Sequence, residues 1–247
     1  MLKYIILGVI QGITEFFPVS SSGHLVLAQK LLGMPTEELA VSIILHLGTA
    51  LALIIFFFKD ILNLLRNARL LLLIIIVTAI TGIIAVAGKD FFEGLFSSSK
   101  GIAVSFMFSG IILILTKKFM DARRKEISIK DALILGVTQA IAIIPAISRS
   151  GITISTLLFR RLDRETSFKF SFLASIPAIL GAALLEAKKV SFAFGANTKG
   201  LTMGFCFSLL TGILSLWLLK VIIKRAKLYY FGYYCIFIAI ITLIFLK

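Results

Sequence analysis

The chain consists mostly of long apolar runs separated by short polar and charged segments. A transmembrane helix needs about 20 predominantly apolar residues, because the hydrocarbon core of a bilayer is about 30 Å thick. The pattern therefore predicts an all-α integral membrane protein with about six transmembrane helices, at residues 39–58, 70–87, 101–119, 166–186, 200–220 and 228–246.

Two further apolar segments, residues 1–32 and 131–160, are interrupted near their middles by proline, glycine, serine and charged residues. Irregular backbone at membrane depth is tolerated only where protein or a water-filled cavity surrounds it. Each segment is therefore predicted to be a re-entrant hairpin, in which two short helices are joined at a polar tip. The two tips are expected to line a cavity.

The two interrupted segments resemble each other when the chain is aligned with itself so that Ser20 falls on Ser148. In this register "SSSG" at 20–23 aligns with "SRSG" at 148–151, and Gln11 aligns with Gln139. The similarity predicts a single membrane domain, residues 1–247, built of two repeats at about 1–119 and 129–247. Because each repeat holds one hairpin and three spans, the second is expected to be inverted relative to the first.

The basic residues predict how the chain is oriented in the membrane. Of the 26 Lys and Arg residues, 17 fall in four predicted loops, at 59–69, 117–130, 160–169 and 220–227. Cytoplasmic loops carry an excess of Lys and Arg, so these loops are assigned to the cytoplasm and both termini to the outer side.

The composition supports a lipid environment and argues against a nucleic-acid partner. Hydrophobic residues make up 59% of the chain, and the mean hydropathy is +1.05, far above the range of soluble proteins. The net charge of +14 is scattered between apolar spans and forms no basic surface interleaved with aromatic residues.

The polar residues of the two hairpins are candidates for a functional site, because ionisable groups inside a membrane are costly and most often functional. The first hairpin contributes Gln11, Glu15, Ser20, Ser21, Ser22 and His24, and the second contributes Ser148, Arg149, Ser150 and Thr153.

The chemistry of these side chains suits a phosphorylated, anionic group. Gln11 and Glu15 are four residues apart and share a helix face, where their oxygens and those of a phosphate could hold Mg²⁺ or Ca²⁺. Each serine loop precedes a helix, whose N-terminus attracts anions, and Arg149 offers a planar fork to phosphate oxygens. Ser21 supplies a hydroxyl whose proton His24, three residues on, could take or give.

Structural interpretations exist for several of these residues. Ser20, Ser22, Ser150 and Thr153 could each simply bridge helices, and Glu15 with Arg149 could be an ion pair without chemistry. His46, within "ILHLG", has no polar neighbour in the sequence and is predicted to be structural.

The stretches "GVIQGITEFFPVSSSGHLVLAQKLLG" and "PAISRSGITISTLLFRRLDRETSFKFSFLASIPAILGA" resemble the two signature regions of the undecaprenyl-diphosphate phosphatase family, the BacA-type bacitracin-resistance proteins. The resemblance covers most of the chain. It implies a multi-pass enzyme of the bacterial plasma membrane that depends on a divalent cation. The enzyme would hydrolyse undecaprenyl diphosphate to the monophosphate lipid carrier that cell-wall synthesis reuses, at a site open to the outer face.

Carried over by motif, the resemblance places Glu15 and Gln11 in an acidic motif, Ser20, Ser21 and His24 in a first loop, and Ser148, Arg149 and Thr153 in a second. The roles expected combine this resemblance with the chemistry of the side chains. Glu15 and Gln11 would hold the cation, although many members have Glu where this chain has Gln11. Ser21 would be the nucleophile and Arg149 the phosphate clamp, with His24 as proton shuttle or, in a rival arrangement, as the nucleophile itself. The remaining phosphate-binding candidates are Ser20, Ser22, Ser148, Ser150 and Thr153. A different function, the flipping of prenyl phosphate across the bilayer, also fits an inverted repeat with hairpins at the midplane.

Overall fold

The computed structural model describes residues 1–34, 39–88, 99–187 and 198–245, and this part of the chain contains helices and no strand. The helices are α1 (Leu2–Phe16), α2 (Ser21–Leu31), α3 (Leu39–Phe56), α4 (Phe58–Leu65), α5 (Ala68–Ala87), α7 (Ser99–Leu115), the 3₁₀ helix η2 (Thr116–Phe119), α8 (Ile129–Ile141), α9 (Arg149–Phe159), α10 (Arg164–Ala187), α11 (Thr198–Lys224) and α12 (Tyr230–Phe245). The prediction of an all-α protein is confirmed for the described residues.

Length and composition identify fewer membrane-capable helices than the six predicted. Four described helices are long and apolar enough by themselves, at Ala68–Ala87, Lys100–Phe119, Arg164–Leu185 and Thr198–Lys224. A fifth is obtained if α3 and α4 are counted as one span, although the chain bends by 71° between them. The apolar helix Tyr230–Ile244 is shorter than these.

Both interrupted segments form two helices, with the break at the polar stretch. Pro18 follows the end of α1, and Pro145 lies between α8 and α9, where the missing N–H of proline breaks no helical hydrogen bond. The second helix of each pair begins at a serine cap. Ser20 Oγ accepts from the Gly23 N–H at 3.4 Å, and Ser148 Oγ accepts from the Gly151 N–H at 3.1 Å. The serine motifs therefore start helices, as their side chains favour.

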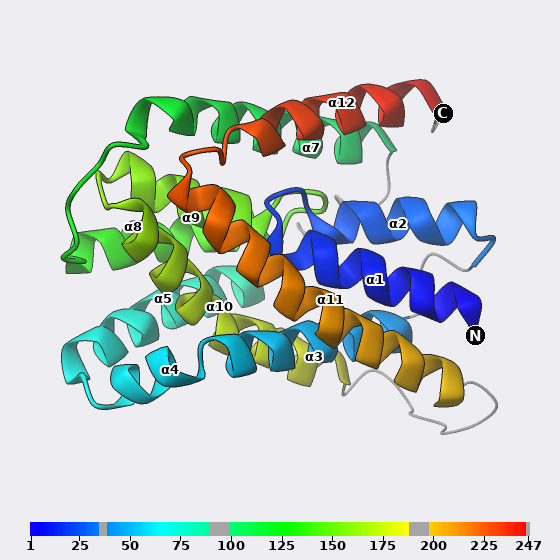
Figure 1. Ribbon diagram of the computed structural model, residues 1–247, viewed down its shortest axis with the longest axis horizontal. Coiled ribbons are helices and arrows are strands. Elements are labelled where there is room, and N and C mark those ends of the chain that lie inside the picture. The colour runs from blue at the N-terminus through cyan, green and yellow to red at the C-terminus, as the bar shows by residue number, and fades with distance from the viewer. Residues whose placement is uncertain (35–38, 89–98, 188–197, 246–247) are drawn as a thin grey trace.

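Helices of the two halves of the chain pack against each other through small residues. Helix α1 lies along α11, where a side chain on Gly8 would clash with the Gly204 carbonyl (Figure 1). Helix α7 lies along α12, where a Cβ on Gly110 would come within 2.8 Å of the Gly232 carbonyl oxygen. Small residues let backbones approach closely, and membrane helices use them because lipid supplies no hydrophobic force between helices.

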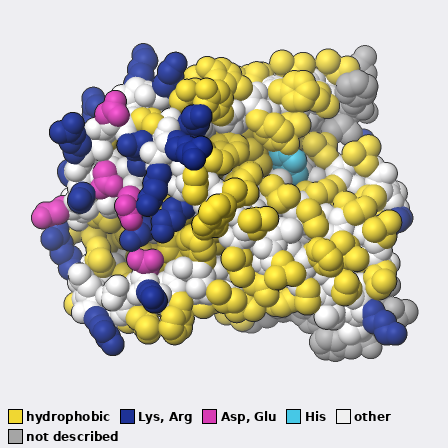
Figure 2. Space-filling model, in the orientation of Figure 1, with side chains coloured by type: hydrophobic (Ala, Val, Ile, Leu, Met, Phe, Trp, Pro, Cys, Tyr) yellow, Lys and Arg dark blue, Asp and Glu magenta, His cyan; other side chains and the backbone are white. Residues whose placement is uncertain are grey.

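The charged residues gather at one end of the molecule. Figure 2 shows most of the visible Lys, Arg, Asp and Glu side chains at the end where α4 and the start of α8 lie in Figure 1, while both chain termini lie at the other end. The surface between the two ends is largely apolar (Figure 2). This distribution suits a protein surrounded by lipid, with one strongly basic face in water.

A buried carboxylate ties the loops together at the charged end. Asp131, in the first turn of α8, accepts from Arg124 Nη1 at 2.7 Å and from Arg160 Nε at 2.9 Å. It also accepts from the Ser128 hydroxyl at 2.7 Å and from the Ser128 backbone N–H at 2.9 Å. Burial raises the pKa of this carboxyl, but the hydrogen bonds outweigh burial and hold the pKa well below its ordinary value. The start of α8 is thereby fixed to the end of α9.

Candidate functional site

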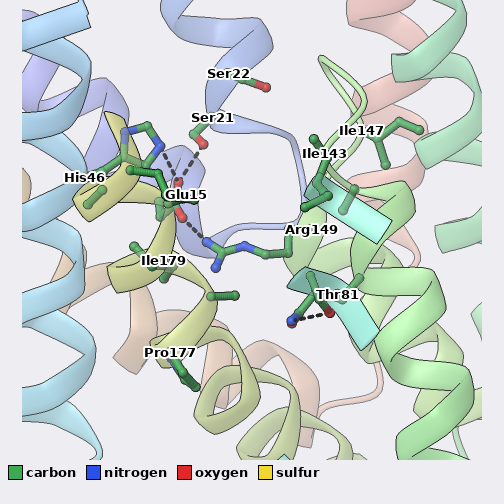
Figure 3. Close-up of a pocket in the computed structure, with 18 of the residues that line it drawn as sticks. Glu15, Ser21, Ser22, His46, Thr81, Ile143, Ile147, Arg149, Pro177 and Ile179 are labelled. Carbon is green, nitrogen blue, oxygen red and sulfur yellow. Dashed lines mark hydrogen bonds and ion pairs between the residues drawn. The ribbon is translucent and has the colours of Figure 1, made fainter. Parts of the chain in front are cut away.

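A cavity of about 450 Å³ lies where the two interrupted segments meet. Its polar wall comes from the end of α1, the start of α2 and the loop between them, from α3, and from the start of α9 with the loop before it (Figure 3). Its apolar wall comes mainly from α5 and α10. The polar lining residues are Thr14, Glu15, Ser20, Ser21, Ser22, Ser42, His46, Thr78, Thr81, Gln139, Ser148 and Arg149.

Glu15, at the end of α1, is the centre of the polar wall. Its carboxylate is buried, and its Oε1 forms an ion pair with Arg149 Nη2. Its Oε2 accepts a hydrogen bond from the Ser21 hydroxyl at 2.6 Å (Figure 3). Arg149 is 134 positions from Glu15 in the sequence and Ser21 is 6 positions from it, yet both converge on one carboxylate. The fold joins a hydroxyl, a carboxylate that can accept its proton, and a guanidinium beside both.

The two loops that carry these groups contact each other directly. Ser22 Oγ accepts a hydrogen bond from the Ala146 N–H at 3.2 Å, so the start of α2 is fastened to the loop before α9. Ser20 and Ala146 both have positive φ angles, of 69° and 62°. Non-glycine residues rarely adopt this conformation, and it costs about 1–3 kcal/mol where it persists. Strained backbone thus lies on both sides of the contact.

His46, predicted to be structural for want of polar neighbours, has a polar neighbour in the structure. Its Nε2 lies 3.7 Å from Glu15 Oε2, and the ring lines the cavity (Figure 3). Its Nδ1 donates to the Ser42 carbonyl at 2.8 Å. The premise of that prediction does not hold, because the sequence around His46 shows only its own helix, whereas its polar neighbour Glu15 belongs to α1. A structural role for His46 stays a prediction.

His24 lies close to Ser21 in sequence but points elsewhere. Its Nδ1 donates to the Ser20 carbonyl at 2.7 Å, and its Nε2 lies 2.8 Å from the Tyr234 hydroxyl on α12. The imidazole stacks on the Tyr234 ring and is absent from the cavity lining. The structure therefore brings Glu15, not His24, to the Ser21 hydroxyl, while the His24 ring is held by the Ser20 carbonyl and Tyr234.

The other predicted phosphate-binding residues divide into two groups. Ser20, Ser22 and Ser148 line the cavity. Ser150 and Thr153 lie behind it, where the Thr153 hydroxyl donates to the Arg149 carbonyl at 2.7 Å and lies 2.6 Å from Ser171 Oγ. The position of Thr153 matches the bridging role that serine and threonine often have in membrane helices, whereas the Ser150 hydroxyl lies 3.4 Å from Ser148 Oγ at the start of its own helix.

Glu15 and Gln11 do not form a ready pair of oxygen ligands for a cation. The Gln11 side chain donates its Nε2–H to Glu15 Oε2 at 3.1 Å, and its buried Oε1 has no hydrogen-bond partner. Arg149 holds the other oxygen of Glu15. Within the described residues, no group of three or more His, Cys, Asp and Glu side chains is placed to hold a metal. A cation at Gln11 and Glu15 stays a prediction, and it would require these donors to move.

The sequence reasoning also missed Gln139 and Thr81 as cavity-lining groups. Gln139 Nε2 donates to Thr81 Oγ1 at 3.2 Å, while its buried Oε1 has no hydrogen-bond partner. The alignment of Gln139 with Gln11 was the available signal. Thr81 lies in an apolar run, and the sequence held no signal that it lines a cavity.

Comparison with known proteins identifies close relatives. A family model described as bacitracin resistance protein BacA matches residues 4–241. The chain is 45% identical over 240 residues to an undecaprenyl-diphosphatase of Carboxydothermus hydrogenoformans, covering 93% of this chain and 91% of the relative. It is 40% identical over 255 residues to an undecaprenyl-diphosphatase of Halothermothrix orenii, covering 99% and 97%. It is also 41% identical over 240 residues to undecaprenyl-diphosphatase 3 of Bacillus cereus, covering 94% and 92%.

Proposed function

The chain belongs to the family of bacitracin resistance protein BacA, and we propose that it is an undecaprenyl-diphosphatase of the bacterial plasma membrane. It removes the terminal phosphate of undecaprenyl diphosphate and returns the monophosphate lipid carrier to cell-wall synthesis. Relatives that carry the name undecaprenyl-diphosphatase match nearly the full length of the chain, which supports this activity.

One observation carries the assignment of the site: Ser21, Glu15 and Arg149 meet at the wall of a cavity. A serine hydroxyl is a weak nucleophile until an adjacent base removes its proton. The 2.6 Å hydrogen bond to Glu15 places such a base against it. Phosphoryl transfer depends chiefly on positioning and on stabilising charge, which the Arg149 guanidinium provides.

In the first step the Ser21 oxygen attacks the terminal phosphorus. Glu15 accepts the hydroxyl proton, the bond between this phosphorus and the bridging oxygen breaks, and the lipid monophosphate leaves. Arg149 neutralises the equatorial oxygens of the phosphoryl group during transfer. Helices α2 and α9 begin at Ser21 and Arg149, so the positive ends of both helix dipoles face the same group.

In the second step water attacks the phosphoserine. The bond between phosphorus and the Ser21 oxygen breaks, Glu15 returns its proton to that oxygen, and inorganic phosphate departs. Both steps use the same carboxylate, first as base and then as acid. When a divalent cation is bound, it supplies further neutralisation of the diphosphate charge.

The site is proposed to open toward the outer face, between two re-entrant hairpins of an inverted repeat with six spans. Three features support this arrangement. In the register that places Ser20 on Ser148, α1 corresponds to α8 and α5 to α11, and α1 packs along α11 as α8 packs along α5. Both termini lie opposite the basic end, which the positive-inside rule assigns to the cytoplasm. The loops of the two hairpins touch through Ser22 and Ala146.

The test is phosphate release from undecaprenyl diphosphate by the purified protein in detergent, with and without chelator. Ser21→Ala and Glu15→Gln should each lower kcat at least 100-fold while the protein stays folded. Ser42→Ala, at a cavity hydroxyl outside the reacting group, serves as the matched control and should retain most of the activity. The phosphoenzyme should be stable in acid, as a phosphoserine is.

Each other outcome removes a part of the proposal. An acid-labile phosphoenzyme would transfer the nucleophilic role to a histidine. Phosphate release that is unchanged by chelator would show that the reaction does not require a divalent cation. No release from the unmodified protein would favour a flippase, since a protein in detergent has no bilayer across which to move lipid.

A further inference from the structure

We propose that the apolar half of the cavity, between α5 and α10, is a slot for the first isoprene units of the substrate. We further propose that Gly82 and Gly181 set its width. This inference rests on the proposed function, because it names where the tail of that substrate lies. The slot is lined on α5 by Gly82, Ala85 and Val86, and on α10 by Ala178, Gly181, Ala182 and Leu185.

Neither the backbone conformation nor the packing of helices requires a glycine at position 82 or 181. Neither has a positive φ, and a Cβ built on either would meet no atom within 4 Å. Gly110 in α7, by contrast, is required by the close approach of α12. A glycine inside a helix lowers the stability of that helix. Gly82 and Gly181 thus leave unoccupied space that faces the cavity from two neighbouring helices.

The corresponding helices of the other half of the chain form a closed pair. In the same repeat register α3 aligns with α10 and α11 with α5, so that Gly181 matches Leu53 and Gly82 matches Leu210. Helices α3 and α11 touch closely, with the Ser208 hydroxyl donating to the Leu45 carbonyl at 2.7 Å. The cavity lies between the pair that carries glycine.

The slot joins the reacting groups to the lipid-facing surface. Arg149 and Ser21 line the same cavity as the two glycines. At its other side, Val86 and Leu185 line the cavity and are also 70% and 58% exposed. A branched isoprenoid chain offers no hydrogen-bonding groups, so it is compatible both with this apolar wall and with the hydrocarbon of the bilayer, whereas water is unfavourable for it. Such a chain can pass along this wall into the bilayer while its diphosphate stays beside Arg149.

The experiment compares two substrates of different tail length in the full-length protein in detergent. Undecaprenyl diphosphate would occupy the whole slot, whereas the single isoprene unit of isopentenyl diphosphate would reach only the part next to the diphosphate. Gly82→Leu and Gly181→Leu should each lower kcat/KM for undecaprenyl diphosphate at least tenfold, mainly by raising KM. For isopentenyl diphosphate the change should stay below threefold. Leucine favours helix over glycine, so both variants are expected to fold.

Ala79→Leu is the matched control, because Ala79 is exposed on α5 and does not line the cavity. It should leave both substrates unaffected, and Gly82→Ala should give an intermediate effect. Equal losses with both substrates would overturn the slot, since they would indicate a distorted catalytic centre. Unchanged rates with both would overturn it as well. Absence of phosphate release by the unmodified protein would instead overturn the proposed function.

Discussion

The imidazole Nε2 of His24 on α2 lies 2.8 Å from the hydroxyl of Tyr234 on α12, and the two rings stack at 5.7 Å with an interplanar angle of 9°. The opposite ring nitrogen donates to the carbonyl of Ser20, whose φ is +69°. Because a carbonyl only accepts, Nδ1 carries the proton, and in the neutral ring Nε2 accepts from Tyr234. Tyr234 therefore orients a ring that holds the strained residue next to Ser21.

Tyr234→Phe should consequently lower kcat about three- to tenfold with little change in KM. The variant loses one hydrogen bond, which contributes about 1 kcal/mol, while its ring still stacks. Steady-state phosphate release measures the effect. Tyr233→Phe, the same change on an exposed neighbour, should be silent. A loss of the size expected for Ser21→Ala would contradict this supporting role and place His24 in the reaction itself.

Glu15 and Arg149 form an ion pair in which the carboxylate is buried and the guanidinium partly exposed, with side-chain exposures of 3% and 22%. Removing one partner leaves the other charge buried, which typically costs about 3–5 kcal/mol. Arg149→Met should therefore lower both activity and the unfolding temperature in detergent. The double variant Glu15→Gln with Arg149→Met should recover most of the stability and none of the activity.

That double variant separates stability from catalysis. A double variant as unstable as the single one would contradict the ion-pair argument, because no uncompensated charge remains in it. Recovery of phosphate release by the double variant would remove both residues from the reaction.

Asp131 should make unfolding depend on pH. The folded-state pKa of its carboxyl lies below the unfolded value of about 3.9. Its contribution is therefore fully present above that unfolded value and is lost as the pH falls through the folded value. Asp131→Asn should cost about 1–2 kcal/mol at neutral pH, because the hydrogen bonds from Arg124 and Arg160 lose their charged acceptor while solvent partly screens both arginines.

The measurement is the free energy of unfolding in detergent between pH 7 and pH 2. The unmodified protein should lose stability toward acid, and Asp131→Asn should lose less over the same range. Asp121→Asn, at an exposed carboxylate, is the matched control and should follow the unmodified protein. Parallel curves for Asp131→Asn and the unmodified protein would contradict the assignment.

His46 is expected to contribute to substrate binding. Its Nδ1 is held by the Ser42 carbonyl, so Nε2 points toward Glu15 and the cavity. The ring therefore stands where a diphosphate bound at Arg149 would contact it. His46→Leu should raise KM about tenfold, with a smaller change in kcat, in a steady-state rate assay. Ser42→Ala keeps the backbone carbonyl that holds His46 Nδ1 and should leave KM unchanged. An unchanged KM would return His46 to a structural role.

The amino-acid sequence was sufficient to predict the class of the protein and the local structure of its two loops. A 59% hydrophobic chain in runs of about 20 residues has few solutions other than membrane helices. The serines at 20 and 148 start helices through contacts only three residues long, with Gly23 and Gly151. Such signals are readable because every atom involved lies within one helical turn. Gln11, Glu15, Ser21 and Arg149 could be selected for the same reason, as polar groups in apolar surroundings.

Which of these groups meet depends on how the helices pack, and the sequence did not predict it. The sequence suggested that His24 belongs to the cavity and that His46 does not, whereas His46 lines the cavity and His24 points toward Tyr234. The direction of a side chain depends on how its helix is rotated against its neighbours. The partner of His46 lies on a different helix, that of His24 is 210 residues away, and that of Arg149 is 134 residues away. Contacts across such separations arise from packing between helices, which hydropathy and spacing along one helix do not encode.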